Sequence, residues 1–386
     1  MRLSDHHERD RPEGPHDLEH AERMLTIDGR EISDDSDCFV IAEVGHNHQG
    51  SLDTCKELFD EAKACGADAV KLQKRDNRSL YTREFFEKPY ENENSFGLTY
   101  GEHREALEFD KAEYKELQDY ADEIGITLFA TAFDYPSVDF LAGLNVPAFK
   151  VASADLRNLP LIRYVAEVGK PMILSTGAAT LEDVDRAYEA VTAVNHRVAL
   201  LQCTAGYPAA WDELDLRVIE TYRERYPSAV VGLSGHDNGI SMPVVAYVLG
   251  ARIVEKHFTL NRAMKGTDHR FSLEPQGLRK LVRDLRRTRR GLGSREKRMY
   301  PSEAEPAIKM GKKLVAARDL PAGYRLRAED IALKSPGDGL PPYELERVVG
   351  CVLREAVHED AALHLEMLEE EKEAAAVGGA ARSDAR

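Results

Sequence analysis

The sequence has 386 residues, of which 42% are hydrophobic and 31% charged, and its formal net charge at pH 7 is −16. This composition is typical of a folded protein long enough for more than one domain, and it excludes an intrinsically disordered chain. The acidic balance argues against binding to the phosphate backbone of nucleic acid or to an anionic membrane surface.

The cysteines and the N-terminal residues indicate the cellular compartment in which the protein works. Five cysteines are scattered along the chain without C-x-x-C spacing, which favours reduced thiols over a disulfide framework. The first thirty residues are mostly polar, and no apolar run approaches the roughly 20 residues of a membrane span. We therefore expect a cytoplasmic protein that has no membrane partner.

Residues 1–30 are expected to form a flexible leader, after which strands and helices alternate. Helices are predicted at 51–65, 111–124, 240–249 and 275–290, and strands at 38–44, 69–73, 127–131, 148–152, 172–175, 198–203, 230–233 and 253–255. Eight strands with intervening helices favour a closed (β/α)8 barrel, the TIM barrel, over residues 31–290. A doubly wound open sheet is the alternative, but no G-x-G-x-x-G follows the first strand.

The remaining segments differ in character. Residues 291–311 are charged, contain two prolines and read as a linker. Residues 312–368 combine short apolar runs with the turn signals P-A-G and S-P-G-D-G-L-P-P, which predict a compact domain of short strands. Residues 369–386 are mostly Ala, Gly and charged residues, which predict a disordered tail. The long insertion at 75–109 suggests a lid that contributes to substrate selection, and the alternative is an oligomer contact or an ordered excursion.

Polar residues stand where the predicted strands end, and in a (β/α)8 barrel these ends build the active site. Lys71 and Lys150 would converge at the mouth of the barrel, and a buried ammonium group needs a partner. Hydroxyl groups would surround the same space, at Thr131, Ser153, Ser175 and Ser234. An isolated strand-end hydroxyl more often satisfies a backbone group. Together, however, these residues describe a site for a small anion such as a phosphate or carboxylate.

Two histidines lie beside this anion site. The segments V-V-G-L-S-G-H and R-I-V-E-K-H-F-T-L are consecutive strands of one βαβ unit, so His236 and His257 would emerge on the same face. They could bind a divalent metal, act as acid/base groups, or be structural hydrogen-bonding residues. Two imidazoles with one carboxylate would form a weak, exchangeable site that suits Mn²⁺ or Mg²⁺ better than Zn²⁺.

These residues predict a barrel enzyme that acts on a small anion with the help of a metal, but they do not choose the reaction. The segments I-A-E-V-G-H-N-H-Q-G, V-K-L-Q, F-K-V-A-S-A-D, I-L-S-T-G, Q-C-T-A-G-Y-P, G-L-S-G-H and E-K-H-F resemble the sialic acid (N-acetylneuraminate, nonulosonic acid) synthase family, including its legionaminic acid relatives. The resemblance spans residues 38–368, because the second domain resembles the C-terminal antifreeze-like SAF domain, a β-clip fold.

The resemblance implies a reaction and a set of roles. Family members condense phosphoenolpyruvate with an N-acylmannosamine-type sugar and water, and release phosphate by C–O cleavage. Phosphoenolpyruvate would bind Lys71, Thr131, Lys150, Ser153, Ser175 and Ser234, and the sugar Gln73, Tyr207 and Asp268. A divalent metal, Mn²⁺ before Mg²⁺ or Co²⁺, would bind His236 and His257, and the catalytic residues would be Glu43, Asp155 and His257. Asn47 and His48 would support the first strand.

Some positions depart from the family pattern. Ala205 stands where Asn is common, Asp155 replaces a Glu of some relatives, and K-S-P-G around Ser335 replaces K-R-P-G. In the family, that arginine reaches the neighbouring subunit's site in a domain-swapped homodimer, and Lys334 and Arg325 are the candidates to replace it here. The sugar therefore stays open between N-acetylmannosamine, its 6-phosphate and a 2,4-diacetamido-2,4,6-trideoxymannose.

Two other classes of function compete with this interpretation. Another phosphoenolpyruvate- or pyruvate-dependent barrel aldolase would use Lys150 or Lys71 as a Schiff-base nucleophile and need no metal. A non-catalytic sugar-binding protein with an ice- or glycan-binding second domain would have little use for a metal beside an anion site.

Overall fold

The computed structural model describes residues 23–369. The chain divides into two units between Gly293 and Ser294, and each unit is described by itself. The ends of the predicted leader and tail, residues 1–22 and 370–386, lie outside the described residues. Within residues 23–369, no helix has the length and apolarity needed to cross a membrane.

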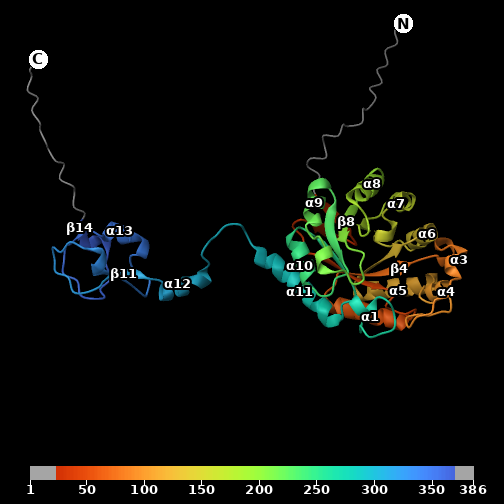
Figure 1. The fold of residues 1–386 in the computed structure, drawn as a ribbon, viewed down its shortest axis with the longest axis horizontal. Helices are drawn as coiled ribbons and strands as arrows, with labels where there is room; N and C mark the ends of the chain where they lie inside the picture. The colour runs from red at the N-terminus through yellow and green to blue at the C-terminus, as the bar shows by residue number, and fades with distance from the viewer. Residues whose placement is uncertain (1–22, 370–386) are drawn as a thin grey trace, which may run out of the picture. The chain divides into compact units, whose positions relative to one another are not determined.

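The first unit is a closed barrel of eight parallel strands, which confirms the predicted (β/α)8 fold (Figure 1). Going round the barrel, β10 pairs with both β9 and β3, so no strand edge is left open. The strands are β3 (Phe39–Gly45), β4 (Ala69–Lys74), β5 (Thr127–Ala132), β6 (Phe149–Val151), β7 (Met172–Ser175), β8 (Val198–Cys203), β9 (Val230–Gly235) and β10 (Ile253–His257).

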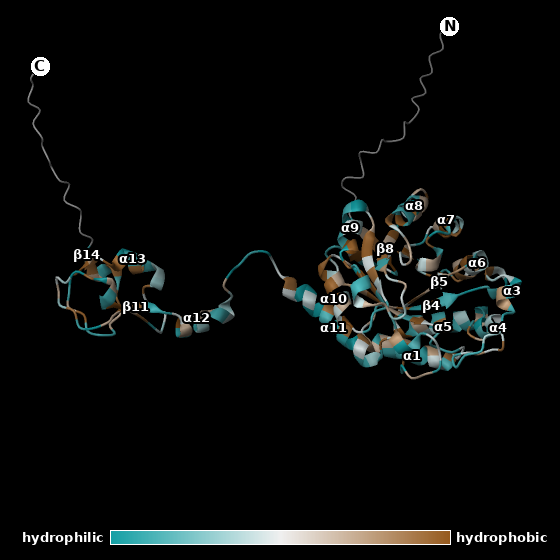
Figure 2. Cartoon of the chain, viewed as in Figure 1, coloured by the Kyte–Doolittle hydropathy of each residue, from teal (hydrophilic) through white to brown (hydrophobic). Residues whose placement is uncertain are grey.

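Helices follow the strands in turn and cover the barrel. They are α1 (Leu52–Cys65), α5 (Lys111–Ile124), α6 (Tyr135–Gly143), α7 (Leu159–Glu167), α8 (Leu181–Thr192), α9 (Val218–Arg225), α10 (Ser241–Val248) and α11 (Pro275–Leu292). Figure 2 shows hydrophobic colouring along the strands around β8 and hydrophilic residues on the surrounding helices. The larger apolar core therefore lies between strands and helices, as the alternating pattern requires.

The barrel interior changes from apolar to polar along each strand, and this change positions the site. Successive side chains of a strand alternate between the interior and the helix layer. On β10, Ile253 belongs to the inner apolar core, whereas Glu255 and His257 line a polar cavity. On β4, Ala69 belongs to that core, and Lys71 lines the cavity. The carboxyl ends of the strands therefore carry the polar groups, as expected for this fold.

A β-hairpin closes the amino end of the barrel, and it corrects the prediction of a leader over residues 1–30. Strands β1 (Met24–Ile27) and β2 (Arg30–Ser33) pair antiparallel through a turn at Asp28 and Gly29, whose φ angles are 49° and 74°. Such a turn suits the twist of a tight hairpin. Its apolar face, Leu25, Ile27 and Ile32, is buried in the same core as the inward-facing barrel residues.

The insertion after β4 is an ordered excursion. It contains three short helices, α2 (Asn77–Leu80), α3 (Arg83–Phe86) and α4 (Tyr100–Glu105). Each begins at a side-chain cap, and α4 has a full capping box between Thr99 and Glu102. Aromatic contacts join the helices, with the ring of Tyr100 lying 4.7 Å from that of Phe85 and 5.3 Å from that of Tyr90.

The second unit has its own small core and short strands, as predicted. It contains α12 (Ala304–Met310), β11 (Lys313–Ala316), β12 (Ile331–Lys334), α13 (Leu345–Val348), β13 (Val352–Leu353) and β14 (Leu368–Glu369). The pairs β11–β12 and β13–β14 are antiparallel, and isolated bridges such as Leu320–Val357 join the intervening segments. Helix α12 lies within the predicted linker 291–311, so that segment is partly helical.

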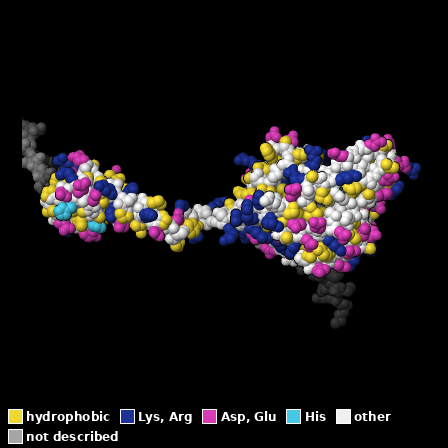
Figure 3. All heavy atoms as spheres, turned by 90° about the horizontal axis from the view of Figure 1, so that it is seen from below, with side chains coloured by type: hydrophobic (Ala, Val, Ile, Leu, Met, Phe, Trp, Pro, Cys, Tyr) yellow, Lys and Arg dark blue, Asp and Glu magenta, His cyan; other side chains and the backbone are white. Residues whose placement is uncertain are grey.

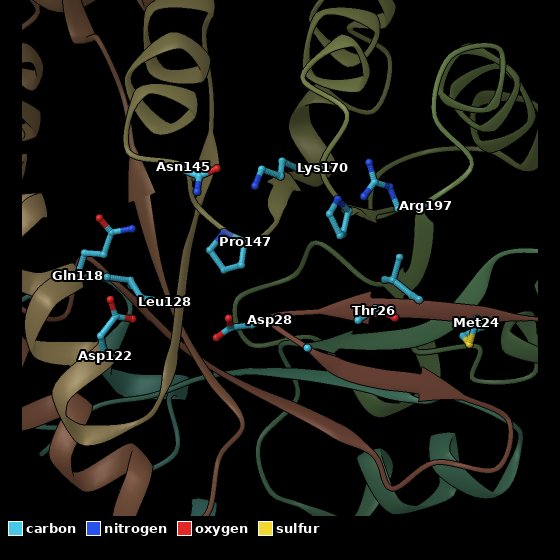
Figure 4. A pocket seen from close by; sticks show the side chains of 13 residues that line it. Met24, Thr26, Asp28, Gln118, Asp122, Leu128, Asn145, Pro147, Lys170 and Arg197 are labelled. Carbon is cyan, nitrogen blue, oxygen red and sulfur yellow. The ribbon is translucent and has the colours of Figure 1, made fainter.

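Two surface features lie away from the carboxyl end of the barrel. A cavity of about 630 Å³ lies between the hairpin and the loops that lead into the strands, with Asp28, Asn145, Lys170 and Arg197 among its walls (Figure 4). The outer face of α11 carries exposed Arg and Lys residues, so basic side chains gather on this acidic protein (Figure 3). The cavity is at the end of the barrel opposite to where barrel enzymes place their active sites.

Candidate active site

A cavity of about 590 Å³ opens at the carboxyl end of the barrel. It is lined by twelve of the thirteen site residues that the sequence predicts: Glu43, Lys71, Gln73, Thr131, Lys150, Ser153, Ser175, Tyr207, Ser234, His236, His257 and Asp268. Residues from every strand of the barrel except β8 itself, and from the loops that follow, therefore converge as expected.

The two predicted lysines each meet a hydroxyl group. Lys71 Nζ donates a hydrogen bond to Thr131 Oγ1 at 2.8 Å, and Lys150 Nζ donates one to Ser175 Oγ at 2.6 Å. Both lysines are at least 97% buried. Burial lowers the pKa of Lys150, although the nearby Glu255 carboxylate opposes the change. These groups form a compact, rigidly held set of donors for an anion.

Glu255 is a central site residue that the sequence interpretation missed. Its carboxylate lies 3.8 Å from Lys71 Nζ and 3.7 Å from Lys150 Nζ, and it accepts a hydrogen bond from Ser234 Oγ at 3.1 Å. Burial alone raises the pKa of Glu255, but the two ammonium groups outweigh it and lower this pKa to about 2. The alternation of β10 could have revealed Glu255, because it shares the inward face with His257.

Lys256 occupies the opposite face of β10. Its Nζ lies 2.9 Å from Asp237 Oδ1, and the side chain is 1% exposed. Lys256 is absent from the cavity wall. The lysine of the E-K-H-F segment is therefore a buried ion-pair partner, while its neighbours on both sides face the site.

His236 and His257 lie side by side, with ring centroids 5.5 Å apart. His236 Nδ1 lies 2.9 Å from the carbonyl oxygen of Thr204, which can only accept, so Nδ1 carries the proton and Nε2 keeps its lone pair. Burial lowers the pKa of His236 to about 4 and also lowers that of His257, so both rings are neutral near pH 7. Neutral imidazoles are the form that binds metals.

The donor set fits a loosely held divalent cation. His257 Nδ1 is buried without a hydrogen-bond partner and lies 3.7 Å from Asp268 Oδ2. Within residues 23–369, no group of three or more His, Cys, Asp or Glu side chains is arranged to hold a metal ion. The protein alone would therefore supply two imidazoles, and other positions would be filled by water or substrate.

Glu43 and Gln73 form a second polar group beside Lys71. Gln73 Nε2 donates a hydrogen bond to Glu43 Oε1 at 2.7 Å, and Glu43 Oε2 lies 2.7 Å from Lys71 Nζ. Burial raises the pKa of Glu43, against the effect of the Lys71 ammonium group. The carboxyl group therefore reaches the cavity in a fixed orientation.

Asp155 is the predicted residue that does not line the cavity. It ends a short 3₁₀ helix, Ser153–Asp155, in which successive side chains point about 120° apart. Ser153 faces the cavity and accepts a hydrogen bond from the Gly177 amide at 2.9 Å. Asp155 accepts a hydrogen bond from Asn158 Nδ2 at 3.4 Å, and burial raises its pKa.

Aromatic rings and a supporting amide complete the walls. The Tyr207 ring lies 4.2 Å from that of His236 and 5.3 Å from that of Phe271. Ala205 also lines the cavity and supplies only a methyl group where the family commonly has an amide. Asn47 donates to Phe258 O and Ser272 Oγ, so it ties β3 to the segment after β10, as predicted for a supporting residue.

The insertion also contributes to the cavity wall through Arg75 and Arg104, which the sequence interpretation did not single out. Arg75 directly follows β4, and its NH2 group donates to Gln73 Oε1 at 2.7 Å. Arg104 comes from α4. The insertion is therefore part of the site, whereas the hypothesis that it moves as a lid stays a prediction.

Comparison with known proteins identifies the family. A model described as the NeuB family matches residues 58–297, and a model described as the SAF domain matches residues 313–369. N-acetylneuraminate-9-phosphate synthase of Mus musculus is 41% identical over 333 residues, which cover 86% of this chain and 93% of the mouse protein. N,N'-diacetyllegionaminic acid synthase of Legionella pneumophila is 34% identical over 319 residues, which cover 81% of this chain and 89% of that protein.

A solved structure agrees with these relationships. The crystal structure of the N-acetylneuraminic acid (sialic acid) synthetase of Leptospira borgpetersenii matches with a TM-score of 0.65 and 30% sequence identity, and the match covers 75% of this chain and 96% of that one. The chain therefore belongs to the NeuB family, and it is an enzyme of the sialic acid synthase class with a SAF domain after its barrel.

Proposed function

We propose that the protein condenses phosphoenolpyruvate with an N-acylmannosamine-type sugar and water, forming a nine-carbon α-keto acid and inorganic phosphate. The observation that carries this proposal is one cavity that holds two buried lysines, strand-end hydroxyls and a pair of neutral imidazoles. The mouse relative is named for N-acetylneuraminate 9-phosphate and the Legionella relative for diacetyllegionaminic acid, which supports a sialic-type product.

Phosphoenolpyruvate binding is assigned to the lysine–hydroxyl set. Lys71 and Lys150 would neutralise its carboxylate and phosphate, while the hydroxyls of Thr131, Ser175 and Ser234 orient it. The negative charge of Glu255 lies between the two lysines. Placed beneath C2 of the substrate, it would stabilise the cation that develops there.

The reaction forms a C–C bond and a C–O bond, and it breaks the bond between C2 and the phosphate oxygen. C3 of phosphoenolpyruvate bonds to the aldehyde carbon of the open-chain sugar, and the aldehyde oxygen takes up a proton. Water then adds to the cationic C2 and loses a proton. The bond between C2 and the phosphate oxygen breaks, which leaves the keto group and inorganic phosphate. Glu43, held by Gln73 and Lys71, is the carboxyl group we assign to proton transfer.

His236 and His257 would hold the metal, and Asp268 is close enough to orient His257. A bound Mn²⁺, or Mg²⁺ or Co²⁺ in its place, would polarise the sugar aldehyde as a Lewis acid. We assign no substrate contact to Asp155, because this residue does not line the cavity. Gln73 and Tyr207 remain the candidates for contacts with the sugar.

The second unit supports the proposal of a domain-swapped homodimer. It exposes several large apolar side chains, including Met310 at 70% and Tyr343 at 83%. Large exposed apolar side chains become more favourable when another surface removes them from water. A second copy of the chain would cover them, and light scattering of wild-type protein against Tyr343→Ser should then show a shift from dimer toward monomer.

The described cysteines support a reducing compartment. Cys38, Cys55, Cys65, Cys203 and Cys351 are all buried free thiols. We accordingly propose a cytoplasmic location, because such thiols need no oxidising environment.

The test is phosphate release from phosphoenolpyruvate in the presence of Mn²⁺ with N-acetylmannosamine, its 6-phosphate or a 2,4-diacetamido-2,4,6-trideoxymannose. Release that requires both metal and a sugar would support the proposed reaction. Absence of release with all three sugars would contradict it. The lowered pKa of Lys150 also suits a Schiff-base aldolase, so borohydride trapping with pyruvate is run in parallel. A covalent adduct on Lys150 would favour the aldolase.

A further inference from the structure

Arg75 and Arg104 lie together at the mouth of the active-site cavity. Both line its wall, and Arg75 is only 8% exposed. The Arg75 guanidinium stacks on Phe133, with Cζ 3.7 Å from the ring centroid, while Arg104 Nε donates to Tyr100 Oη at 3.0 Å. These contacts hold both guanidinium groups in place at the cavity wall.

Both arginines contact the imidazole ring of His46. Arg75 NH1 lies 3.1 Å from His46 Nε2, and Arg104 NH1 lies 3.2 Å from His46 Nδ1. Guanidinium groups only donate, and a neutral imidazole can accept at only one of its two nitrogens. Burial and the two arginines keep the pKa of His46 well below its usual range, so the ring is neutral. In one of the two contacts, an arginine N–H group therefore faces the N–H group of the imidazole.

The arginines differ from the lysines of the cavity in their partners. Lys71 and Lys150 have carboxylates within 4 Å. Among the ion pairs of residues 23–369, none involves Arg75 or Arg104. Arg75 is buried beside this second cation, and Glu108 and Asp268 compensate the two positive charges only from beyond ion-pair distance. Burial and the charge of Arg104 accordingly lower the pKa of Arg75. An arriving anion would relieve this cost.

The position of the two arginines relative to Lys71 and Gln73 indicates which part of the bound sugar they contact. Lys71, Gln73 and Arg75 occupy alternate positions from the middle of β4 outward. Four residues of an extended chain span about 13 Å, so Arg75 lies roughly that far along the backbone from Lys71, with Gln73 halfway between them. Lys71 belongs to the phosphoenolpyruvate set and Gln73 to the sugar set. The arginines therefore face the end of the sugar that is remote from the reacting aldehyde carbon.

We propose that Arg75 and Arg104 bind a phosphate group on the sugar, so that the substrate is a 6-phosphate of an N-acylmannosamine-type sugar. This inference rests on the proposed function. Two guanidinium groups match the oxygens of a dianionic phosphate group, whereas a hydroxyl or acetamido group at that end would supply no anionic partner.

Arg104 is the residue to test, because Arg75 also orients Gln73 and its removal would disturb sugar contacts directly. Full-length protein with Mn²⁺ is compared as wild type, Arg104→Ala and Arg104→Lys, using N-acetylmannosamine 6-phosphate and N-acetylmannosamine. We expect wild type to prefer the phosphorylated sugar. Arg104→Ala should lower kcat/KM for that sugar by roughly 10- to 100-fold, mainly through KM. It should change kcat/KM for the free sugar by less than about threefold, and Arg104→Lys should recover part of the loss.

The control is Arg78→Ala in the same insertion. Arg78 pairs with Glu105, is 71% exposed and is outside the cavity wall, so both sugars should react as with wild type. A KM for phosphoenolpyruvate that stays constant in Arg104→Ala would show that the phosphoenolpyruvate site is intact.

The outcomes separate this inference from the proposed function. Equal losses with both sugars, or a raised KM for phosphoenolpyruvate, would overturn the phosphate assignment. So would a wild-type enzyme that turns over only an unphosphorylated sugar, although the condensation itself would then stand. If wild type releases phosphate with no sugar at all, the proposed function fails first.

Discussion

The carboxylate of Glu255 and the ammonium group of Lys150 lie 3.7 Å apart at the bottom of the active-site cavity. Lys71 is at a similar distance on the other side of the same carboxylate, 3.8 Å from it. One negative charge therefore separates two positive charges that would otherwise repel each other in a buried place. The same charge would face the reacting carbon of a bound anion.

Replacing Glu255 with Gln should lower kcat without weakening the binding of phosphoenolpyruvate. Gln keeps an acceptor for Ser234 Oγ but removes the charge. The lysines would then attract phosphoenolpyruvate at least as strongly, so its KM should not rise. The developing cation would lose its counter-charge, and kcat should fall by about 100-fold. Initial rates of phosphate release give both constants.

The control for this change is Glu220→Gln on the exposed side of α9, which should behave as wild type. An unchanged kcat in Glu255→Gln would show that the carboxylate serves only to keep the two lysines together.

His236→Asn tests the proposed metal site without relying on turnover. Asn fills similar space but lacks the imidazole nitrogen that is freed by the contact with Thr204 O. The affinity for Mn²⁺, measured by titration calorimetry, should fall by about 10- to 100-fold. His196→Asn, at an exposed histidine, should leave the affinity unchanged. Equal Mn²⁺ binding in all three proteins would place the metal elsewhere.

The barrel and most of the site could be predicted because their signals are local. Each strand is a short apolar run that ends in polar residues, and alternation then decides which side chains face the interior. Glu255 was missed because the interpretation chose the histidine that follows the predicted strand 253–255 instead of the last residue of that strand. Asp155, at the end of the 3₁₀ turn after β6, is outside the cavity wall, and its catalytic role stays a prediction.

Other features depend on contacts that span the fold. Arg75 and Arg104 meet at His46 only because three short helices fold the insertion back over β4. The hairpin at residues 24–33 has strands of four residues, which carry little periodicity, although the Asp28-Gly29 pair is a recognised hairpin signal. Its burial against the barrel could not be read from so short a pattern.

That hairpin yields a prediction about stability. Ile32 is completely buried in the inner core, so Ile32→Ala should lower the free energy of unfolding by about 2–5 kcal/mol. The active site is at the other end of the barrel, and kcat/KM per folded molecule should be retained. Met24→Ala on the same hairpin, where the side chain is 44% exposed, should cost about 0.5 kcal/mol or less. Urea unfolding followed by circular dichroism measures both, and equal effects would mean that the hairpin does not seal the core.

Asp34, directly after β2, links the hairpin to the barrel and makes this link sensitive to pH. It accepts hydrogen bonds from Arg23 NH1 at 3.0 Å and from Arg223 NH1 at 2.6 Å. Partial burial opposes ionisation, but the hydrogen bonds and charges of Arg223 and Arg23 outweigh it and lower the pKa of Asp34 below its ordinary value. Because the folded-state pKa is the lower one, the stabilisation is present above the unfolded-state pKa, near pH 4, and is lost as pH falls through the folded-state value. Asp34→Asn should therefore be less stable than wild type at pH 7, and the difference in thermal midpoint should shrink toward pH 3. A difference that stays constant over this range would show that the carboxylate contributes through its shape and not through its charge.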